Sequence, residues 1–252
     1  PVRAPKPGYF HLAWRSRANE FLDTAPCPSA GQPEVEYPYS DGKVLIEIDP
    51  HARSIIEMRN SLKMHFIDRA DAYMAGSMAV YYRQGDPTAV VEPDVFVVLG
   101  AQHKEWRKSY LIWEEGGVVP SFVVDVAADL PGRRDATSKR AKYERIGVRE
   151  YWRFDPLGEL IPDGLEGWRL EGGRYKSVQA VREAGWHRSE ALGLELRPEG
   201  WLLRFHDPLL GRDLLTHAET SAALERAERE RDRANQRIRE LEARLRSSSD
   251  TG

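Results

Sequence analysis

The sequence predicts an α/β domain that continues into a β-rich extension and a C-terminal helix. The first observation is the order helix, three strands, helix, strand, at residues 51–68, 78–82, 90–99, 121–128, 135–146 and 150–156. The second is a series of short strands with glycine turns over residues 157–211. The third is a helical spacing of apolar residues that begins at Leu224.

The composition limits the class of protein. The chain has 252 residues, of which 41% are hydrophobic, so it can bury a sizeable core. No stretch approaches the roughly 20 apolar residues of a membrane span, and the first residues, PVRAPKP, lack the apolar segment of a secretion signal. Cys27 is the only cysteine, which excludes internal disulfides and Cys-based zinc sites. We therefore expect a cytoplasmic protein.

The chain divides into five segments by composition. Seven prolines and few aliphatic residues in the first part predict an extended Pro-rich arm, and the predicted core follows it. A β-rich extension of the same domain, a charged heptad helix and a disordered tail come next. The boundaries are 1–40, 41–156, 157–216, 217–247 and 248–252.

Each element of the core has its own signal. An amphipathic helix is predicted by the spacing of Ile55, Ile56, Met58, Leu62, Met64, Phe66 and Ile67. Residues 78–82 and 90–99 predict a hairpin with a long connection. The next helix would begin at Asp135 as N-cap and end at Gly147.

Residues 121–128, SFVVDVAA, predict a strand that is buried on both faces. Asp125 is the one charged residue in it. Burying an unpaired carboxylate is costly, so the residue needs an explanation. Asp94 has a similar place, directly before the apolar segment 95–99. Each acid alone has a structural explanation, a turn or a buried ion pair. On adjacent strands, however, the two would repel each other unless a cation lay between them, and oxygen ligands favour Mg²⁺ or Mn²⁺.

The following helix supplies positive charge. Lys139 can direct an ammonium group toward the two acids, and Lys142 and Tyr143 lie three and four residues further on. Between residues 132 and 149 the local charge is +5, although the whole chain carries −3. Such a run is either a solvated face or a nucleic-acid contact, and Arg133, Arg134 and Lys142 are the candidates for that contact. Two acids beside a lysine suit metal-dependent hydrolysis of phosphodiesters.

The last segment has a heptad seam at Leu224, Ala227, Arg231, Ala234, Ile238, Leu241 and Leu245. A dimerising coiled coil and a single exposed helix held by ion pairs both agree with this pattern. Arg231 and the two alanines weaken the seam, so the alternatives stay open.

Four motifs occur in an order that resembles a known family. They are Glu92-Pro-Asp-Val-Phe-Val-Val98, Val123-Val-Asp-Val126, Asp135-(x)3-Lys139-(x)3-Tyr143, and Gly147-Val-Arg-Glu-Tyr-Trp152 followed by Asp155-Pro156. They resemble the Uma-two family of restriction endonuclease-like proteins, within the PD-(D/E)XK nuclease superfamily. The resemblance spans residues 40–215 and is strongest over 90–156.

The resemblance implies a fold, a site and a partner. The fold is the αβββαβ mixed sheet flanked by helices that forms the restriction-endonuclease-like core. Asp94 and Asp125 would bind Mg²⁺ or Mn²⁺ and, with Lys139, form the catalytic set, while Glu47, His51 and Tyr143 would be accessory. The partner would be nucleic acid, with DNA expected, and the protein could form a homodimer through its core or C-terminal helix.

The chain also departs from the family pattern. The family usually has glutamate at the position of Asp125, serine at Ala128 and proline at Asp129. An aspartate side chain is one methylene shorter, so it reaches less far. The alternative function is therefore a catalytically weakened nucleic-acid-binding or coiled-coil assembly protein that retains the nuclease fold.

Overall fold

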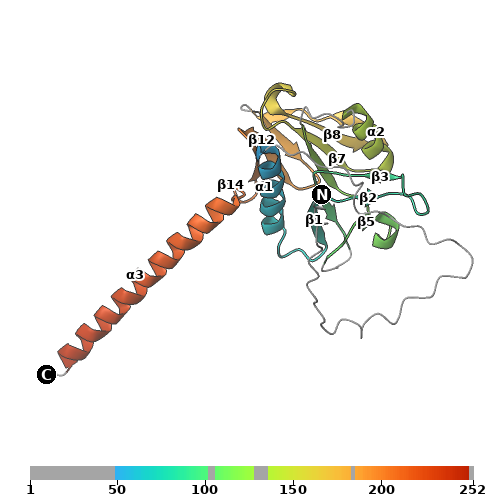
Figure 1. The fold of residues 1–252 in the computed structure, drawn as a ribbon. Helices are drawn as coiled ribbons and strands as arrows, with labels where there is room; N and C mark the ends of the chain where they lie inside the picture. Colours follow the sequence, from blue (N-terminus) through green and yellow to red (C-terminus); the bar gives the residue numbers. More distant parts are fainter. Residues whose placement is uncertain (1–48, 102–105, 128–135, 183–184, 250–252) are drawn as a thin grey trace, which may run out of the picture. The chain divides into compact units, whose positions relative to one another are not determined.

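The computed structural model of the protein describes residues 49–101, 106–127, 136–182 and 185–249, with side chains up to residue 242 (Figure 1). The predicted arm 1–40 and most of the predicted tail lie outside these ranges. A search of the described residues finds no helix long and apolar enough to cross a membrane.

A six-stranded sheet forms the centre of the fold, in the order β1-β4-β6-β7-β8-β9. The strands are Ala72–Gly76, Val95–Leu99, Phe122–Val126, Glu150–Phe154, Leu165–Glu171 and Arg174–Ser177. Among the neighbours within this sheet only β6 and β7 run parallel, and helix α2 (Ala136–Ile146) lies between them in the chain. Parallel neighbours need such a crossover connection, and a helix usually provides it.

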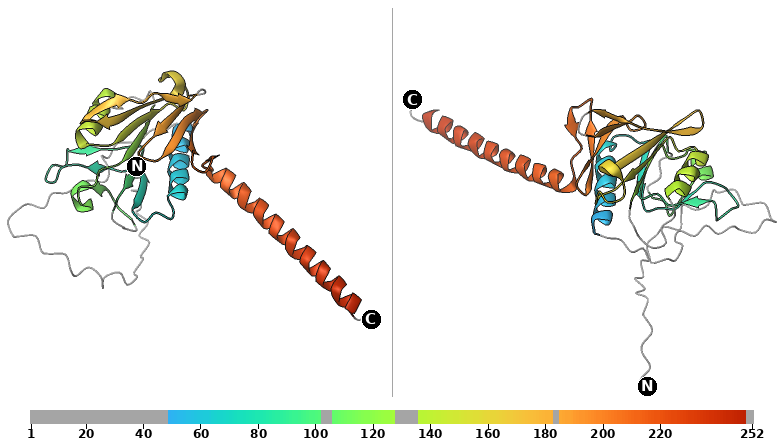
Figure 2. Two further views of the ribbon diagram at one scale, coloured as in Figure 1. Left: turned by 180° about the vertical axis from the view of Figure 1, so that it is seen from behind. Right: turned by 90° about the horizontal axis from the view of Figure 1, so that it is seen from above.

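The two faces of this sheet are covered by different elements. On one face, Val95, Val97 and Phe122 pack in a single cluster with residues of helix α1 (Asp49–His65) and of a second sheet. Figures 1 and 2 show α1, in blue, beside the orange strands of that sheet. On the other face, Phe96 and Val98 pack with residues of α2 and of a small third sheet. Odd and even positions of each strand therefore belong to different cores, as strand geometry requires.

The predicted hairpin of residues 78–82 and 90–99 is confirmed only for the start of its second segment. The second segment forms two separate strands, β3 (Val90–Val91) and β4, because Pro93 between them has no N–H for a ladder. Strand β2 (Val80–Tyr81) pairs with β3 and with β5 (Tyr110–Leu111) in the third sheet. The antiparallel partner of β4 is β1, a strand that the sequence pattern did not predict.

With β1 included, the elements α1-β1-β4-β6-α2-β7 give the expected αβββαβ order. The β-rich extension is confirmed as well. Strands β8 and β9 lengthen the main sheet, and their turn at Gly172 and Gly173 has positive φ at both residues, which is the conformation of a type I′ hairpin. The other sheet contains β10 to β14, at Ala180–Arg182, Trp186–Ser189, Leu194–Glu199, Leu202–Asp207 and Arg212–Asp213.

Helix α3 (His217–Ser249) begins at a capping box. The Thr216 amide donates to the Glu219 carboxylate at 2.8 Å, and the Glu219 amide donates to the Thr216 hydroxyl at 3.2 Å. Arg204 of β13 donates to the same carboxylate at 2.9 Å, so the first turn of the helix is fixed to the second sheet.

Gly167 is required by the packing of the main sheet. It lies directly opposite Trp152 on the neighbouring strand, and a β-carbon at this position would clash with the indole ring. We predict that Gly167→Ala lowers the free energy of unfolding by about 2 kcal/mol, because well-packed cores tolerate added atoms poorly. Denaturant titration measures this loss. In a Trp152→Phe background the cost of the alanine should fall, and an unchanged cost would contradict the assignment to the indole.

Candidate active site

Two aspartates meet where β4 begins and β6 ends. In the antiparallel ladder Val95 pairs with Val124, so Asp94 and Asp125 occupy the next pair of positions. Both lie on the face of the sheet that α2 covers, since Asp125 alternates with Val124 and Val126 of the other core. Asp94 is 9% exposed and Asp125 is 5% exposed, so the site contains two buried carboxylates from adjacent strands.

The two carboxylates are held by each other's strand. The amide of Val126 donates to Oδ2 of Asp94 at 2.7 Å, and the amide of Asp94 donates to Oδ1 of Asp125 at 3.3 Å. Backbone N–H groups at a strand end would otherwise need another partner. This exchange satisfies them and fixes both acids in the same small region.

Lys139 reaches this region from α2. Its Nζ lies 3.0 Å from Oδ1 of Asp125 and donates to the carbonyl oxygen of Glu92 at 3.3 Å. The lysine side chain is 24% exposed and that of Asp125 only 7%, so the ammonium group lies on the solvent side of the carboxylate. The structure thus brings together the three residues that the sequence analysis placed in the catalytic set.

Burial controls the electrostatics of Asp125. Loss of solvent raises the pKa of this carboxyl, and the nearby charge of Asp94 raises it further, while the Lys139 ammonium opposes both effects. The ion pair with Lys139 therefore offsets only part of the cost of burying this carboxylate. A further positive charge at this position would be stabilising.

His51, in the first turn of α1, belongs to the same site. Its ring is buried, and Nε2 lies 3.7 Å from Oδ2 of Asp94. This position agrees with the accessory place that the resemblance implies for His51. Glu47, the other acidic candidate, lies outside the described residues.

Tyr151 is a site residue that the sequence analysis did not identify. Its hydroxyl donates to Oδ2 of Asp125 at 3.1 Å, so Asp125 is held from the side of β7 as well. Tyr151 is fully buried and lies on the α2 face of the sheet, next to the accessory candidate Tyr143 at a ring distance of 4.8 Å. Strand parity places Tyr151 and Trp152 on opposite faces of β7, but both residues are buried, so the sequence alone does not tell which of them faces the acids.

The hydroxyl of Tyr143 is buried and has no hydrogen-bond partner among the described residues. Burial raises its pKa well above the ordinary value, and the charge of Asp125 adds to that effect. The ring contact with Tyr151 places this residue near the acids, and its hydroxyl makes no hydrogen bond with either carboxylate.

The expected nucleic-acid contacts are only partly described. Arg133 and Arg134 lie outside the described residues. Lys142 lies on α2, three residues after Lys139, with its side chain half-buried. These three residues therefore remain predictions.

The donor set fits a hard divalent cation. The described residues contain no cluster of three or more His, Cys, Asp and Glu side chains suited to bind a metal. Mg²⁺, however, is commonly held by one or two carboxylates and completes its shell with water and substrate phosphate. Asp94 and Asp125 supply such a pair.

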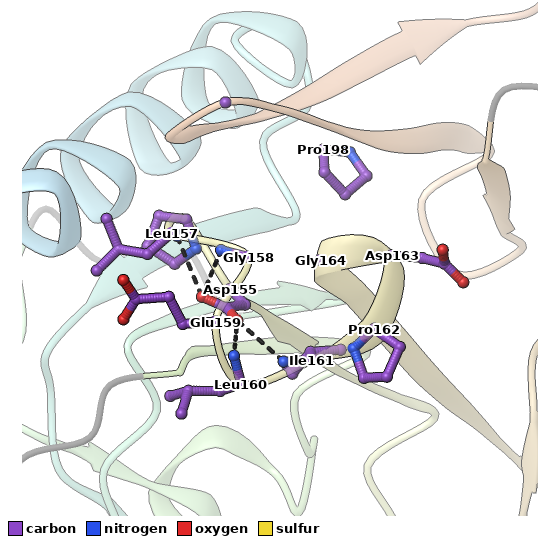
Figure 3. A pocket seen from close by; sticks show the side chains of 12 residues that line it. Asp155, Leu157, Gly158, Glu159, Leu160, Ile161, Pro162, Asp163, Gly164 and Pro198 are labelled. Atoms are coloured by element: carbon purple, nitrogen blue, oxygen red, sulfur yellow. Dashed lines mark hydrogen bonds between the residues drawn. The ribbon is translucent and has the colours of Figure 1, made fainter.

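A cavity of about 640 Å³ follows the end of β7 and does not include these acids (Figure 3). Asp155 of the family motif organises its wall. Burial pushes the pKa of this carboxyl up, but backbone N–H donors outweigh that effect and lower it. The donors are Leu157, Gly158, Leu160 and Ile161. Asp155 is therefore satisfied by its own loop, and we assign it a structural role.

The raised pKa of Asp125 predicts a pH dependence of stability. The folded protein retains a proton above the ordinary pKa of 3.8, where the unfolded chain has lost it, so stability falls as the pH rises through this window. The asparagine of Asp125→Asn does not ionise, so this variant does not lose stability in this way. We predict that in chelating buffer the free energy of unfolding of the variant increases relative to wild type as the pH rises from about 4 to about 7.

Asp71→Asn is the matched control. The Arg69 guanidinium lowers the pKa of the Asp71 carboxyl, so the stability that this group contributes is lost only as the pH falls below about 3.8. The stability of this variant relative to wild type should therefore stay nearly constant from about pH 4 to about pH 7. Equal slopes for the two variants in denaturant titrations would contradict the assignment of a penalty to Asp125.

A known protein family matches most of the chain. The sequence pattern of the family described as "Uma2: Putative restriction endonuclease" matches residues 18–199. One similar solved structure is titled a putative nuclease belonging to DUF820, from Anabaena variabilis ATCC 29413. It is 14% identical, the match covers 64% of this chain and 86% of that one, and the TM-score is 0.43.

The search of curated proteins finds no match. The family pattern covers most of the chain and includes β4, β6, α2 and β7 with all three clustered residues. The chain therefore belongs to the Uma2 family of restriction endonuclease-like proteins.

Proposed function

We propose that the protein is a metal-dependent endonuclease that hydrolyses phosphodiester bonds of nucleic acid, with DNA as its substrate. The observation that carries the proposal is the convergence of Asp94, Asp125 and Lys139 on one partly solvent-accessible point. Family membership supports nuclease chemistry, and the residues support the dependence on a metal.

Asp94 and Asp125 would hold Mg²⁺ or Mn²⁺ with their carboxylate oxygens. The cation would supply a water of lowered pKa and a Lewis acid for the phosphate. The protein contributes two rigid ligands, because the exchanged hydrogen bonds between Asp94 and the amide of Val126, and between Asp125 and the amide of Asp94, leave them little freedom. Preorganised ligands of this kind do not have to be ordered when the substrate binds.

Lys139 would act on the substrate side of the site. Its ammonium group is partly exposed and lies against Asp125, so a phosphate that approaches from solvent meets it directly. A fixed positive charge at this point would orient a water or stabilise the negative charge that develops on the phosphate oxygens. Tyr151 would act through Asp125, as a positioning residue that holds the carboxylate from behind.

Substrate binding requires positive charge outside the catalytic set, because the whole chain carries −3. We propose that Arg133, Arg134 and Lys142 make phosphate contacts on either side of Lys139. Such contacts position the nucleic acid but do not read its sequence. Their strength should fall as salt increases, since each contact releases counterions.

Plasmid nicking in the presence of Mg²⁺ or Mn²⁺ tests the proposal. We predict that wild type converts supercoiled plasmid to the open-circular form and that Asp94→Asn abolishes this conversion. Lys139→Ala should lower the rate by about 10²- to 10³-fold, the usual effect of losing one electrostatic stabiliser. Lys63→Ala, an exposed lysine in the last turn of α1, is the matched control and should cleave like wild type.

Two outcomes would contradict the proposal. Wild type that binds DNA but cleaves neither DNA nor RNA with either metal would favour the alternative, a nucleic-acid-binding protein that retains the nuclease fold. Cleavage that survives in Asp94→Asn would place the activity elsewhere in the chain.

A further inference from the structure

Helix α3 presents an apolar stripe that the core does not cover. We define the seam as Leu224, Ala227, Arg231, Ala234, Ile238 and Leu241, which follow one another at alternating spacings of three and four. Leu224 is 60% exposed, Ile238 is 53% exposed and Leu241 is 51% exposed. Ordinary surface helices turn such a stripe toward their own core.

The contacts of α3 with the rest of the protein are at its first turn. Arg204 and Thr216 bind Glu219, and the His217 amide donates to the Glu57 carboxylate of α1 at 2.9 Å. Every residue from Leu224 to Glu242 is exposed. The helix is therefore attached at one end, and its seam is available along most of its described length.

We propose that the seam binds the seam of a second copy of the chain, with the two helices antiparallel. In an antiparallel pair of helices each residue of heptad type a (Leu224, Arg231, Ile238) packs against one of type d (Ala227, Ala234, Leu241). One register then contains no layer of two small side chains. It places Leu224 opposite Leu241, Ala227 opposite Ile238, and Arg231 opposite Ala234. By symmetry each pairing occurs twice, which gives six layers.

The central layers explain why Arg231 and the two alanines are compatible with the seam. The long stem of Arg231 can cover the small Ala234 of the other copy while its charged end stays in water. In a parallel pair in register, by contrast, each residue meets its own copy. Two Arg231 side chains would then face each other in the seam, and Ala227 and Ala234 would leave underfilled layers. A polar residue in such a seam commonly selects one arrangement over another.

The flanking charges are compatible with the same register. Glu230 and Arg237 both occupy positions that border the seam, and both are exposed. In the antiparallel register Glu230 of one copy lies beside Arg237 of the other, twice per dimer. Opposite charges at these positions set orientation and partner choice in helical pairs.

In this register the two helices overlap along almost their whole length. Its two-fold axis falls between Asp232 and Arg233, within about one residue of the middle of His217–Ser249. A helix of this length spans roughly 50 Å at 1.5 Å per residue. Because each core is fixed to the N-terminal turn of its helix, the antiparallel pair would carry the two cores at opposite ends. The two candidate active sites would then act on separate phosphodiesters.

Disulfide trapping on the full chain tests the register. Cys27→Ser removes the only natural cysteine, and Ala227→Cys with Ile238→Cys then places thiols opposite each other in the predicted dimer. Within one helix these positions lie about 16 Å apart, too far for a disulfide. We expect mild oxidation to convert at least half of this variant to covalent dimer on non-reducing gels.

Three comparisons make the test decisive. Neither single cysteine variant should crosslink, whereas a parallel pair would trap Ala227→Cys alone. Arg229→Cys with Glu240→Cys has the same spacing on the outer face of the helix and should stay uncrosslinked. Dimers from a single variant, or equal crosslinking of the outer-face pair, would overturn the antiparallel register.

Solution mass supplies an independent readout that does not depend on nuclease activity. Light scattering of wild type at micromolar concentration should give the mass of a dimer, and Leu224→Glu with Leu241→Glu should give that of a monomer. Both substitutions are at exposed positions, so circular dichroism should show an unchanged fold. A wild-type chain that is monomeric at tens of micromolar would overturn the proposal.

Discussion

The site depends on one electrostatic constraint, the burial of two carboxylates on adjacent strands. Asp94 and Asp125 are fixed by backbone amides of each other's strands, so neither can turn away to reduce the repulsion. Lys139 balances part of the charge, yet the pKa of Asp125 is still raised. Natural proteins keep such arrangements mainly where function requires them. A divalent cation is the simplest group that would remove the remaining imbalance.

The sheet topology creates this constraint from residues that are far apart in sequence. Pro93 ends the pairing of β3, and Asp94 follows at the point where β4 joins the main sheet. The parallel pair β6–β7 requires a crossover, and that crossover is α2, which carries Lys139. Tyr151 on β7 then holds Asp125 from the far side. Each contact follows from strand order, and a change of register by one residue would separate the set.

Much of this arrangement could be predicted from sequence, for identifiable reasons. Asp125 was conspicuous as the one charge in an apolar strand, and the spacing from Asp125 to Lys139 suited a strand followed by a crossover helix. Strand β1 could not be predicted, because its residues, AYMAG, show neither alternation nor a strong β preference. Tyr151 was missed for a related reason. Its role depends on which face of β7 meets α2, and a strand buried on both faces does not reveal this in its pattern.

The central claim is that Asp94 and Asp125 together hold one divalent cation. Calorimetric titration of the metal-free protein with Mn²⁺ tests it most directly, because it needs neither a substrate nor Lys139. The account predicts binding of about one Mn²⁺ per chain, weakened at least tenfold in both Asp94→Asn and Asp125→Asn but retained in Lys139→Ala. No binding by wild type, or equal binding by the Asp94→Asn variant, would contradict it.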